Sequence, residues 1–140
     1  MKKLYTAAAS YAVLGLVSGV FYREFGRLND YFGPTRLSTL HTHLLVLGMF
    51  FFLIALALNA AFRLDADKRF NAFFWTYNVG VLWTTTMMIF RGVNEVIEPG
   101  YVLPAALAGI SGLGHIILTV GIVLFFMVLG KQTSKVQRAS

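Results

Sequence analysis

Four long apolar runs, separated by short connections, constrain the fold of this chain more than any other feature. A helix that crosses a bilayer needs about 20 mostly apolar residues, and four runs of roughly that length take up most of the 140 residues. The helices predicted from these runs cover about residues 4–22, 37–62, 70–90 and 103–130. Because the connections are short, sequential helices should lie antiparallel. The sequence therefore predicts a single domain over residues 1–140, an all-α integral membrane four-helix bundle in up-down-up-down order.

The composition is typical of a membrane protein and excludes several kinds of chemistry. Hydrophobic residues make up 57% of the chain and charged residues only 13%, so no extramembrane catalytic domain is expected. Cysteine is absent, which excludes disulfides, thiolate metal sites and iron–sulfur clusters. The start Met1-Lys2-Lys3 resembles that of a secretory signal, but the apolar run that follows is too long for one. We therefore interpret residues 4–22 as a helix of the mature protein.

The net charge of +6 comes from basic residues that lie beside the apolar runs, so we expect contact with membrane lipid and no nucleic-acid partner. On the side of both termini lie Lys2, Lys3, Arg63, Lys68, Arg69, Lys131, Lys135 and Arg138. On the other side lie Arg23, Arg27, Arg36 and Arg91. Since the side richer in basic residues usually faces the cytoplasm, both termini are predicted to be cytoplasmic, in a multi-pass protein of the bacterial inner membrane.

All three histidines lie inside predicted membrane helices, where such side chains usually mark a functional site. His41 lies near the start of the second helix, and His115 lies in the fourth. Counting residues from the charged helix ends places both side chains in the outer half of the membrane. Bundles hold cofactors between facing helices, and haem iron accepts histidine as an axial ligand. We therefore predict a haem whose iron is bound by His41 and His115.

Small residues and arginines near these histidines fit a porphyrin with its propionates. Gly48 lies seven residues after the first predicted ligand, and Gly112 lies three residues before the second. Such residues leave room for a flat ring, although small residues also serve close helix packing. Further small residues on the two faces are Ala55, Asn59, Ala108, Ser111 and Thr119. Arg36 and Arg91, at the outer ends of their helices, are candidates to bind the propionates, with lipid headgroup contact as the alternative.

His43 has no predicted place at the same iron, because residues two apart on a helix point about 200° apart. Four roles stay open for its side chain. It binds a second haem or copper on the opposite face, contacts a second copy of the chain, transfers protons, or is only a polar residue near the membrane interface.

The segment Arg36-Leu37-Ser38-Thr39-Leu40-His41-Thr42-His43 resembles the start of the second helix in the catalytic subunit of the haem-copper oxidases. The resemblance is strongest to nitric oxide reductases and cbb-type oxidases, where the run is similar to Arg-Leu-Arg-Pro-Leu-His-Thr-Asn. It implies that His41 is an axial ligand of a low-spin haem b, and it gives His43 no ligand role. The segment Ser111-Gly112-Leu113-Gly114-His115 takes the place of the family's second ligand.

The chain also resembles small four-helix bacterial membrane proteins with His-x-His on helix 2 and Gly-x-Gly-His on helix 4. The oxidase subunit has many more helices and further histidines for a non-haem metal, which this chain lacks. The resemblance therefore implies a haem b site and electron transfer rather than the full oxidase reaction.

The preferred hypothesis is a membrane b-type cytochrome that transfers electrons or senses redox state or gas, with a quinol or another cytochrome as electron donor. A haem enzyme that acts on oxygen, nitric oxide or quinol is one alternative. The others are a metal or proton transporter with Glu95 and Glu98 at its mouth, and an assembly subunit without a cofactor. Four helices leave one side of a pocket poorly shielded from lipid, so a homodimer is also expected.

Overall fold

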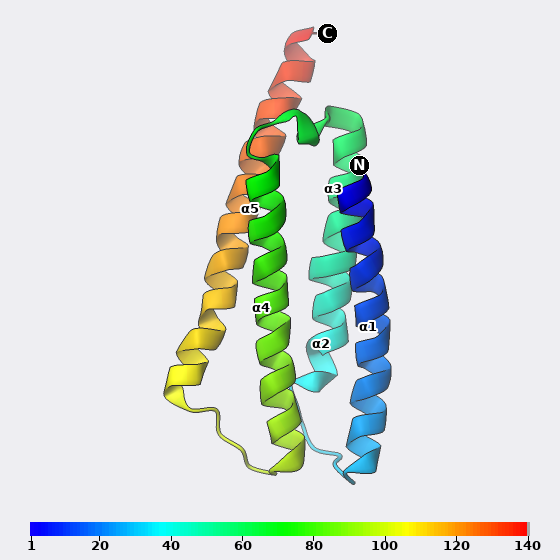
Figure 1. Cartoon of the computed structure of the whole chain (residues 1–140), viewed down its shortest axis with the longest axis vertical. Coiled ribbons are helices and arrows are strands. Elements are labelled where there is room, and N and C mark those ends of the chain that lie inside the picture. The colour runs from blue at the N-terminus through cyan, green and yellow to red at the C-terminus, as the bar shows by residue number, and fades with distance from the viewer. Residues whose placement is uncertain (140) are drawn as a thin grey trace.

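The computed structural model describes residues 1–139 and shows helices joined by short connections (Figure 1). The α-helices are α1 (Lys2–Leu28), α2 (Leu37–His43), α3 (Phe51–Phe62), α4 (Phe70–Ile97) and α5 (Ala105–Ala139). A π-helical segment, η1 (Leu44–Phe50), joins α2 to α3, and a 3-10 turn, η2 (Leu64–Ala66), precedes α4. Because α2, η1 and α3 follow one another without a break, the described residues form four helical rods and no strand, which confirms the predicted all-α class.

Three of the four rods are long and apolar enough to cross a membrane by length and composition, namely Lys2–Leu28, Leu37–Phe62 and Ala105–Arg138. Helix α4 has 28 residues, but it carries more polar residues, including Asn71, Asn78 and Thr84, and it is not among the three. The bounds predicted for the second rod agree with the structure, whereas α1, α4 and α5 extend farther toward the C-terminus than the apolar runs did.

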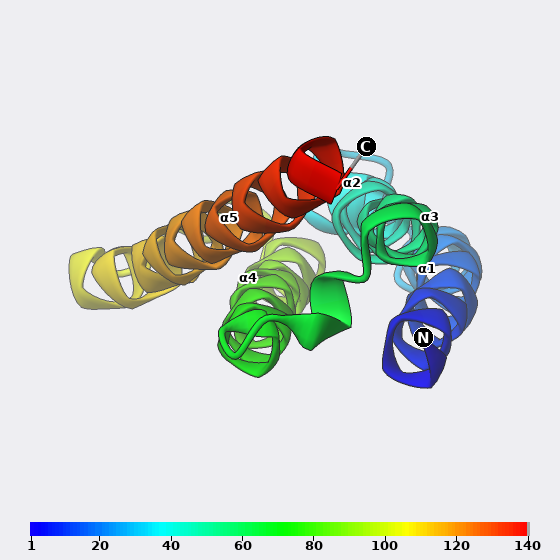
Figure 2. The same ribbon diagram turned by 90° about the horizontal axis from the view of Figure 1, so that it is seen from above.

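The two chain ends and the α3–α4 connection lie at one end of the molecule, and the other two connections lie at the opposite end (Figure 1). The α2–η1–α3 rod is central, with α1 packed along it and α4 packed beside it. Helix α5 packs along α4 and also contacts α3. Seen from above, α1 and α4 lie on either side of the central rod (Figure 2).

Two glycines allow α4 and α5 to approach backbone to backbone. A Cβ atom added to Gly80 of α4 would lie 2.8 Å from the backbone nitrogen of Leu118. A Cβ atom added to Gly121 of α5 would lie 2.9 Å from the Cα atom of Tyr77. Because these neighbours are backbone atoms, no side-chain rotation would make room for a larger residue at either position.

A cluster of aromatic side chains joins the central rod to α4 and α5. Phe51 stacks on Tyr77 with 3.9 Å between ring centroids, and Phe125 of α5 packs against Phe51 at 5.1 Å. The hydroxyl of Tyr77 donates a 2.9 Å hydrogen bond to the carbonyl oxygen of Leu47, within η1. The aromatic cluster therefore also binds the π-helical backbone.

A buried carboxylate ties the start of α4 to the C-terminal part of α5. Asp67 Oδ1 accepts hydrogen bonds from the backbone amide of Arg69 at 2.9 Å and from its Nε at 3.2 Å. Lys131 Nζ lies 3.0 Å from Asp67 Oδ2, and the Asp67 side chain is 0% exposed. The pKa of Asp67 is held well below its usual range, mainly by the hydrogen bond from the Arg69 amide. The Arg69 guanidinium and the Lys131 ammonium add to this effect, and burial of the carboxylate opposes it.

Replacement of this carboxylate should destabilise the fold in a pH-dependent way. We expect Asp67→Asn to lower the free energy of unfolding by about 2 kcal/mol near neutral pH, because charge-assisted hydrogen bonds are lost. The pKa of Asp67 is lower in the folded than in the unfolded chain, where it is about 3.9. Its contribution is therefore complete above about pH 5 and is lost as the pH falls through the folded-state value.

Unfolding in detergent, followed by circular dichroism across this pH range, measures the difference between the two proteins. Asp65→Asn is the matched control, because that carboxylate is 41% exposed and lies 3.6 Å from the N-terminal ammonium. Its loss should change stability by less than about 1 kcal/mol. Equal effects of the two variants would contradict the role assigned to the buried carboxylate.

Candidate cofactor-binding site

A cavity of about 240 Å³ lies between the start of the central rod and α5, with α4 as its floor. Its lining consists of Arg36, Thr39 and His43 from the start of the central rod, Thr84, Met87, Met88 and Arg91 from α4, and Ser111 and His115 from α5. A second, more polar cavity of about 430 Å³ adjoins it and shares Arg36, Thr39 and Arg91. The two form one recess, in which the histidines line only the smaller cavity, called the inner cavity below, and Arg36, Thr39 and Arg91 line both. His115 is exposed and His43 is half-buried.

The start of α2 is held against α4 by a short hydrogen-bonded contact. Thr35 Oγ1 donates to the carbonyl oxygen of Gly92 at 2.9 Å and accepts a hydrogen bond from the Leu37 amide at 3.3 Å. Gly92 has no side chain to obstruct this contact, since a Cβ atom there would lie 2.7 Å from Leu37 N. Thr35 thus supplies an acceptor for the first backbone amide of α2.

The structure brings His43, rather than His41, into the same cavity as His115. His43 Nδ1 donates a 2.9 Å hydrogen bond to the carbonyl oxygen of Thr39. A neutral ring held in this way keeps the lone pair on Nε2, the nitrogen that remains for a metal. The two imidazoles come from different helices, and both line the same cavity of about 240 Å³.

Charge at the recess is arranged around Glu95. Its carboxylate accepts a 2.8 Å hydrogen bond from Arg91 Nε and a 2.7 Å hydrogen bond from the Arg36 backbone amide. Within residues 1–139, no carboxylate is paired with the Arg36 guanidinium. Two guanidinium groups therefore face one carboxylate, and the recess has an excess of positive charge that suits an anionic group.

An unpaired buried hydroxyl also lies at the inner cavity. Thr84 is 5% exposed, and among the described residues its Oγ1 has no hydrogen-bond partner. Met87 and Met88 lie on the same floor and supply soft thioether groups. The Thr84 hydroxyl oxygen lies against Gly114 of α5, where an added Cβ atom would collide with it, so α5 covers this group and it is not presented to a ligand in the cavity.

His41 and Gly48 lie on another face of the central rod, against α1. A Cβ atom added to Gly19 of α1 would lie 3.8 Å from His41 Cβ, and one added to Gly48 would lie 2.6 Å from Tyr11 Cβ. His41 Nδ1 is buried and has no hydrogen-bond partner among residues 1–139. The sequence correctly placed His41 and Gly48 on one helix face, but that face packs on α1 and not toward α5.

The other predicted residues divide in the same way. Arg36 and Arg91 line the recess with His43 and His115. Gly112 is exposed, and a Cβ atom there would have no neighbour within 4 Å. Thr84 and the two methionines were missed as site residues, because threonine and methionine in an apolar helix indicate packing as readily as binding.

The chain was compared with known families, curated proteins and solved structures. The model of a family described as protein of unknown function, DUF2871, matches residues 1–132. Neither the curated proteins nor the solved structures gave a match. Because the match covers nearly the whole sequence, the chain belongs to the DUF2871 family.

Proposed function

We propose that this protein is a membrane b-type cytochrome that binds one haem in the recess between α2 and α5, with His43 and His115 as the axial ligands. In this proposal the four rods cross the bacterial inner membrane in up-down-up-down order, with both termini cytoplasmic. The observation that carries the proposal is that imidazoles from two different rods line one cavity that two arginines also line.

The residues present match what a haem requires. His43 is oriented by its hydrogen bond to the Thr39 carbonyl, which favours metal binding through Nε2. Arg36 and Arg91 lie where the two cavities join and would pair with propionates. Bound haem would supply a site that is oxidised and reduced by one electron. The resemblance of residues 36–43 to a haem-binding helix supports a haem beside this helix, but it implies His41 as the ligand, whereas the cavity is lined by His43.

The inner cavity is small for a porphyrin, since ligand pockets usually measure about 300–1,000 Å³. Gly109 and Gly112 of α5 face open space, because Cβ atoms there would have no neighbours within 4 Å. Between them, the carbonyl oxygen of Ile110 accepts a 2.9 Å hydrogen bond from Trp83 Nε1 of α4. We infer that haem binding would have to move this part of α5 outward and break that hydrogen bond.

The absorption spectrum of the purified protein from haem-replete cells tests the proposal. We expect a Soret band, sharp bands in the visible region after reduction, and one haem per chain. Carbon monoxide should leave the reduced spectrum unchanged, since both axial positions are filled. A shift with carbon monoxide would instead indicate an open position and favour the haem enzyme. A colourless protein would refute the cytochrome.

A copper site is the second candidate, and the small volume of the inner cavity favours it. Imidazole and thioether groups together suit Cu(I), and Met87 and Met88 lie in the same lining as His43 and His115. Elemental analysis distinguishes the two candidates. A copper site would retain one copper per chain in a protein without a Soret band. The Met87→Leu/Met88→Leu variant should lose that copper. Iron in haem, unaffected by that double substitution, would exclude copper.

A further inference from the structure

A long apolar groove runs between α1 and α4, along a face of α4 different from the one that forms the cofactor recess. A cavity of about 690 Å³ lies between α1 and α4 at the N-terminal end of α1, and a cavity of about 420 Å³ follows it along α1. Leu14 and Leu82 line both cavities. The two cavities are therefore parts of one groove, which follows α1 from Lys3 to Phe21.

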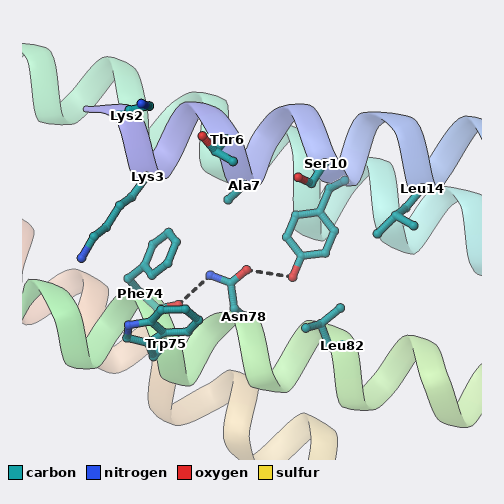
Figure 3. Close-up of a pocket in the computed structure, with 11 residues that line it drawn as sticks. Lys2, Lys3, Thr6, Ala7, Ser10, Leu14, Phe74, Trp75, Asn78 and Leu82 are labelled. Carbon is teal, nitrogen blue, oxygen red and sulfur yellow. Dashed lines mark hydrogen bonds between the residues drawn. The ribbon is translucent and has the colours of Figure 1, made fainter.

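The walls of this groove are apolar and exposed. Figure 3 shows side chains of α1 and α4 facing each other across it, among them Ala7, Leu14, Phe74 and Trp75. Trp75 is 61% exposed, and Leu14 is 46% exposed. In a protein that spans a membrane, exposed apolar surface faces lipid hydrocarbon, so these walls are suited to contact with acyl chains.

Two of the polar side chains that line the groove are already hydrogen-bonded. Tyr11 donates a 2.9 Å hydrogen bond to Asn78 Oδ1, and Asn78 Nδ2 donates a 2.7 Å hydrogen bond to the carbonyl oxygen of Phe74. These bonds satisfy the Tyr11 hydroxyl and the Asn78 amide without a ligand. Apart from the hydroxyls of Thr6 and Ser10, the surface that remains for an occupant along this part of the groove is hydrocarbon, which suits an acyl chain.

Positive charge lies at the N-terminal end of the groove. Lys2 and Lys3 line it there, and Lys3 Nζ reaches α4, where it donates a 3.2 Å hydrogen bond to Asn71 Oδ1. In the part of the chain that the structure describes, neither lysine forms an ion pair, whereas the N-terminal ammonium pairs with Asp65. An anionic group at this end would meet two ammonium groups that have no acidic partner.

The length of the first cavity, from Lys3 to Leu14, matches one leaflet of a membrane. From Lys3 to Leu14 the helix rises about 16 Å, at about 1.5 Å per residue. Half of a hydrocarbon core about 30 Å thick is about 15 Å. An acyl chain that begins at the lysines would therefore end close to the middle of the bilayer, near Leu14 and Leu82, which line both cavities.

We propose that this groove binds one anionic phospholipid, with its phosphate at Lys2 and Lys3 and an acyl chain between α1 and α4. A second copy of the chain in the same orientation would bring its own lysines to this level, and like charges would repel. The proposal rests on the membrane insertion given under Proposed function and not on haem, so a colourless protein would leave it intact.

Quenching of Trp75 fluorescence by brominated lipid tests this site. The protein has two tryptophans, so the Trp83→Phe variant makes Trp75 the only reporter. It is placed in vesicles of phosphatidylcholine that contain increasing fractions of dibrominated phosphatidylglycerol. A second series contains the same fractions of dibrominated phosphatidylcholine in place of the dibrominated phosphatidylglycerol. Because each of the two lysines contributes about 1 kcal/mol near a membrane surface, half-maximal quenching should need roughly 30-fold less of the anionic lipid.

Three variants distinguish a local site from general attraction to the membrane. Lys2→Gln/Lys3→Gln should remove the preference for the anionic lipid. Lys135→Gln/Arg138→Gln removes the same charge from α5 at the same end of the molecule (Figure 1) and should leave the preference unchanged. Ser10→Leu fills the groove at an exposed position that lines it and should weaken quenching by either lipid without changing charge.

Several outcomes would overturn the proposal. Equal quenching by the two lipids in the parent protein would show no selection for an anionic headgroup. An equal loss of preference in both charge variants would show attraction to the membrane surface alone. Quenching by neither lipid would show that something else, such as a second copy, covers Trp75. Circular dichroism of each variant shows whether it has folded.

Discussion

His43→Ala and His115→Ala proteins are each expected to bind haem at least roughly 100-fold more weakly than the parent protein, because each substitution removes an axial ligand. The His41→Ala protein should keep its haem, since His41 packs against α1 at Gly19 and does not line the recess. Haem content per chain, measured after purification and after titration with haem, gives the three affinities.

Histidine at position 41 is the matched control, because it has the same chemistry and lies two residues from His43 on the same helix. Added imidazole should restore the spectrum of His43→Gly by entering the space that the side chain leaves. Loss of haem from His41→Ala, with haem retained in His43→Ala, would instead assign the ligand pair to His41 and His115. Equal retention in all three variants would exclude an axial role for these histidines.

Substitution of Gly121 should destabilise the protein more than substitution of any exposed glycine. We expect Gly121→Ala to lower the free energy of unfolding by about 2–3 kcal/mol, because a methyl group placed 2.9 Å from Tyr77 Cα forces α4 and α5 apart. Gly121→Leu should prevent the native packing of the two helices. The midpoint of unfolding in detergent measures both effects.

Gly109→Ala is the control on the same helix, because nothing lies within 4 Å of its added methyl group. Alanine favours a helix over glycine by up to about 1 kcal/mol, so this variant should be equally stable or slightly more stable. Similar losses in both variants would mean that α5 responds to any glycine substitution, and the close approach of α4 and α5 would not explain the result.

The class of the fold follows from the sequence because its signals are local. The apolar run from Leu37 to Phe62 matches the bounds of the central rod, and Pro104 directly precedes α5. The ends of α1 and α4 were missed by several residues. Both helices continue past their apolar runs through charged residues such as Arg23 and Arg91, which helices tolerate outside hydrocarbon.

The composition of the site was predicted more closely than the choice of histidine. Periodicity shows which residues share a face of a helix, and it correctly grouped His41 with Gly48. It does not show which neighbour each face meets, because α1 and α5 are both apolar and both carry glycines. Gly15 packs against Leu45 and Gly48 packs against Tyr11, so the face of the central rod that carries His41 meets α1. His43 lies on a different face, which lines the cavity shared with α5.

The π-helical segment η1 gives the two halves of the central rod separate orientations. Its i→i+5 hydrogen bonds make each turn wider than an α-helical turn, so residues beyond Phe50 are out of phase with the histidines before Leu44. The Tyr77 hydroxyl bonded to Leu47 holds this change of phase in place. Gain or loss of one residue within 44–50 would therefore turn both imidazoles about the rod axis while the aromatic stack at Phe51 stayed where it is.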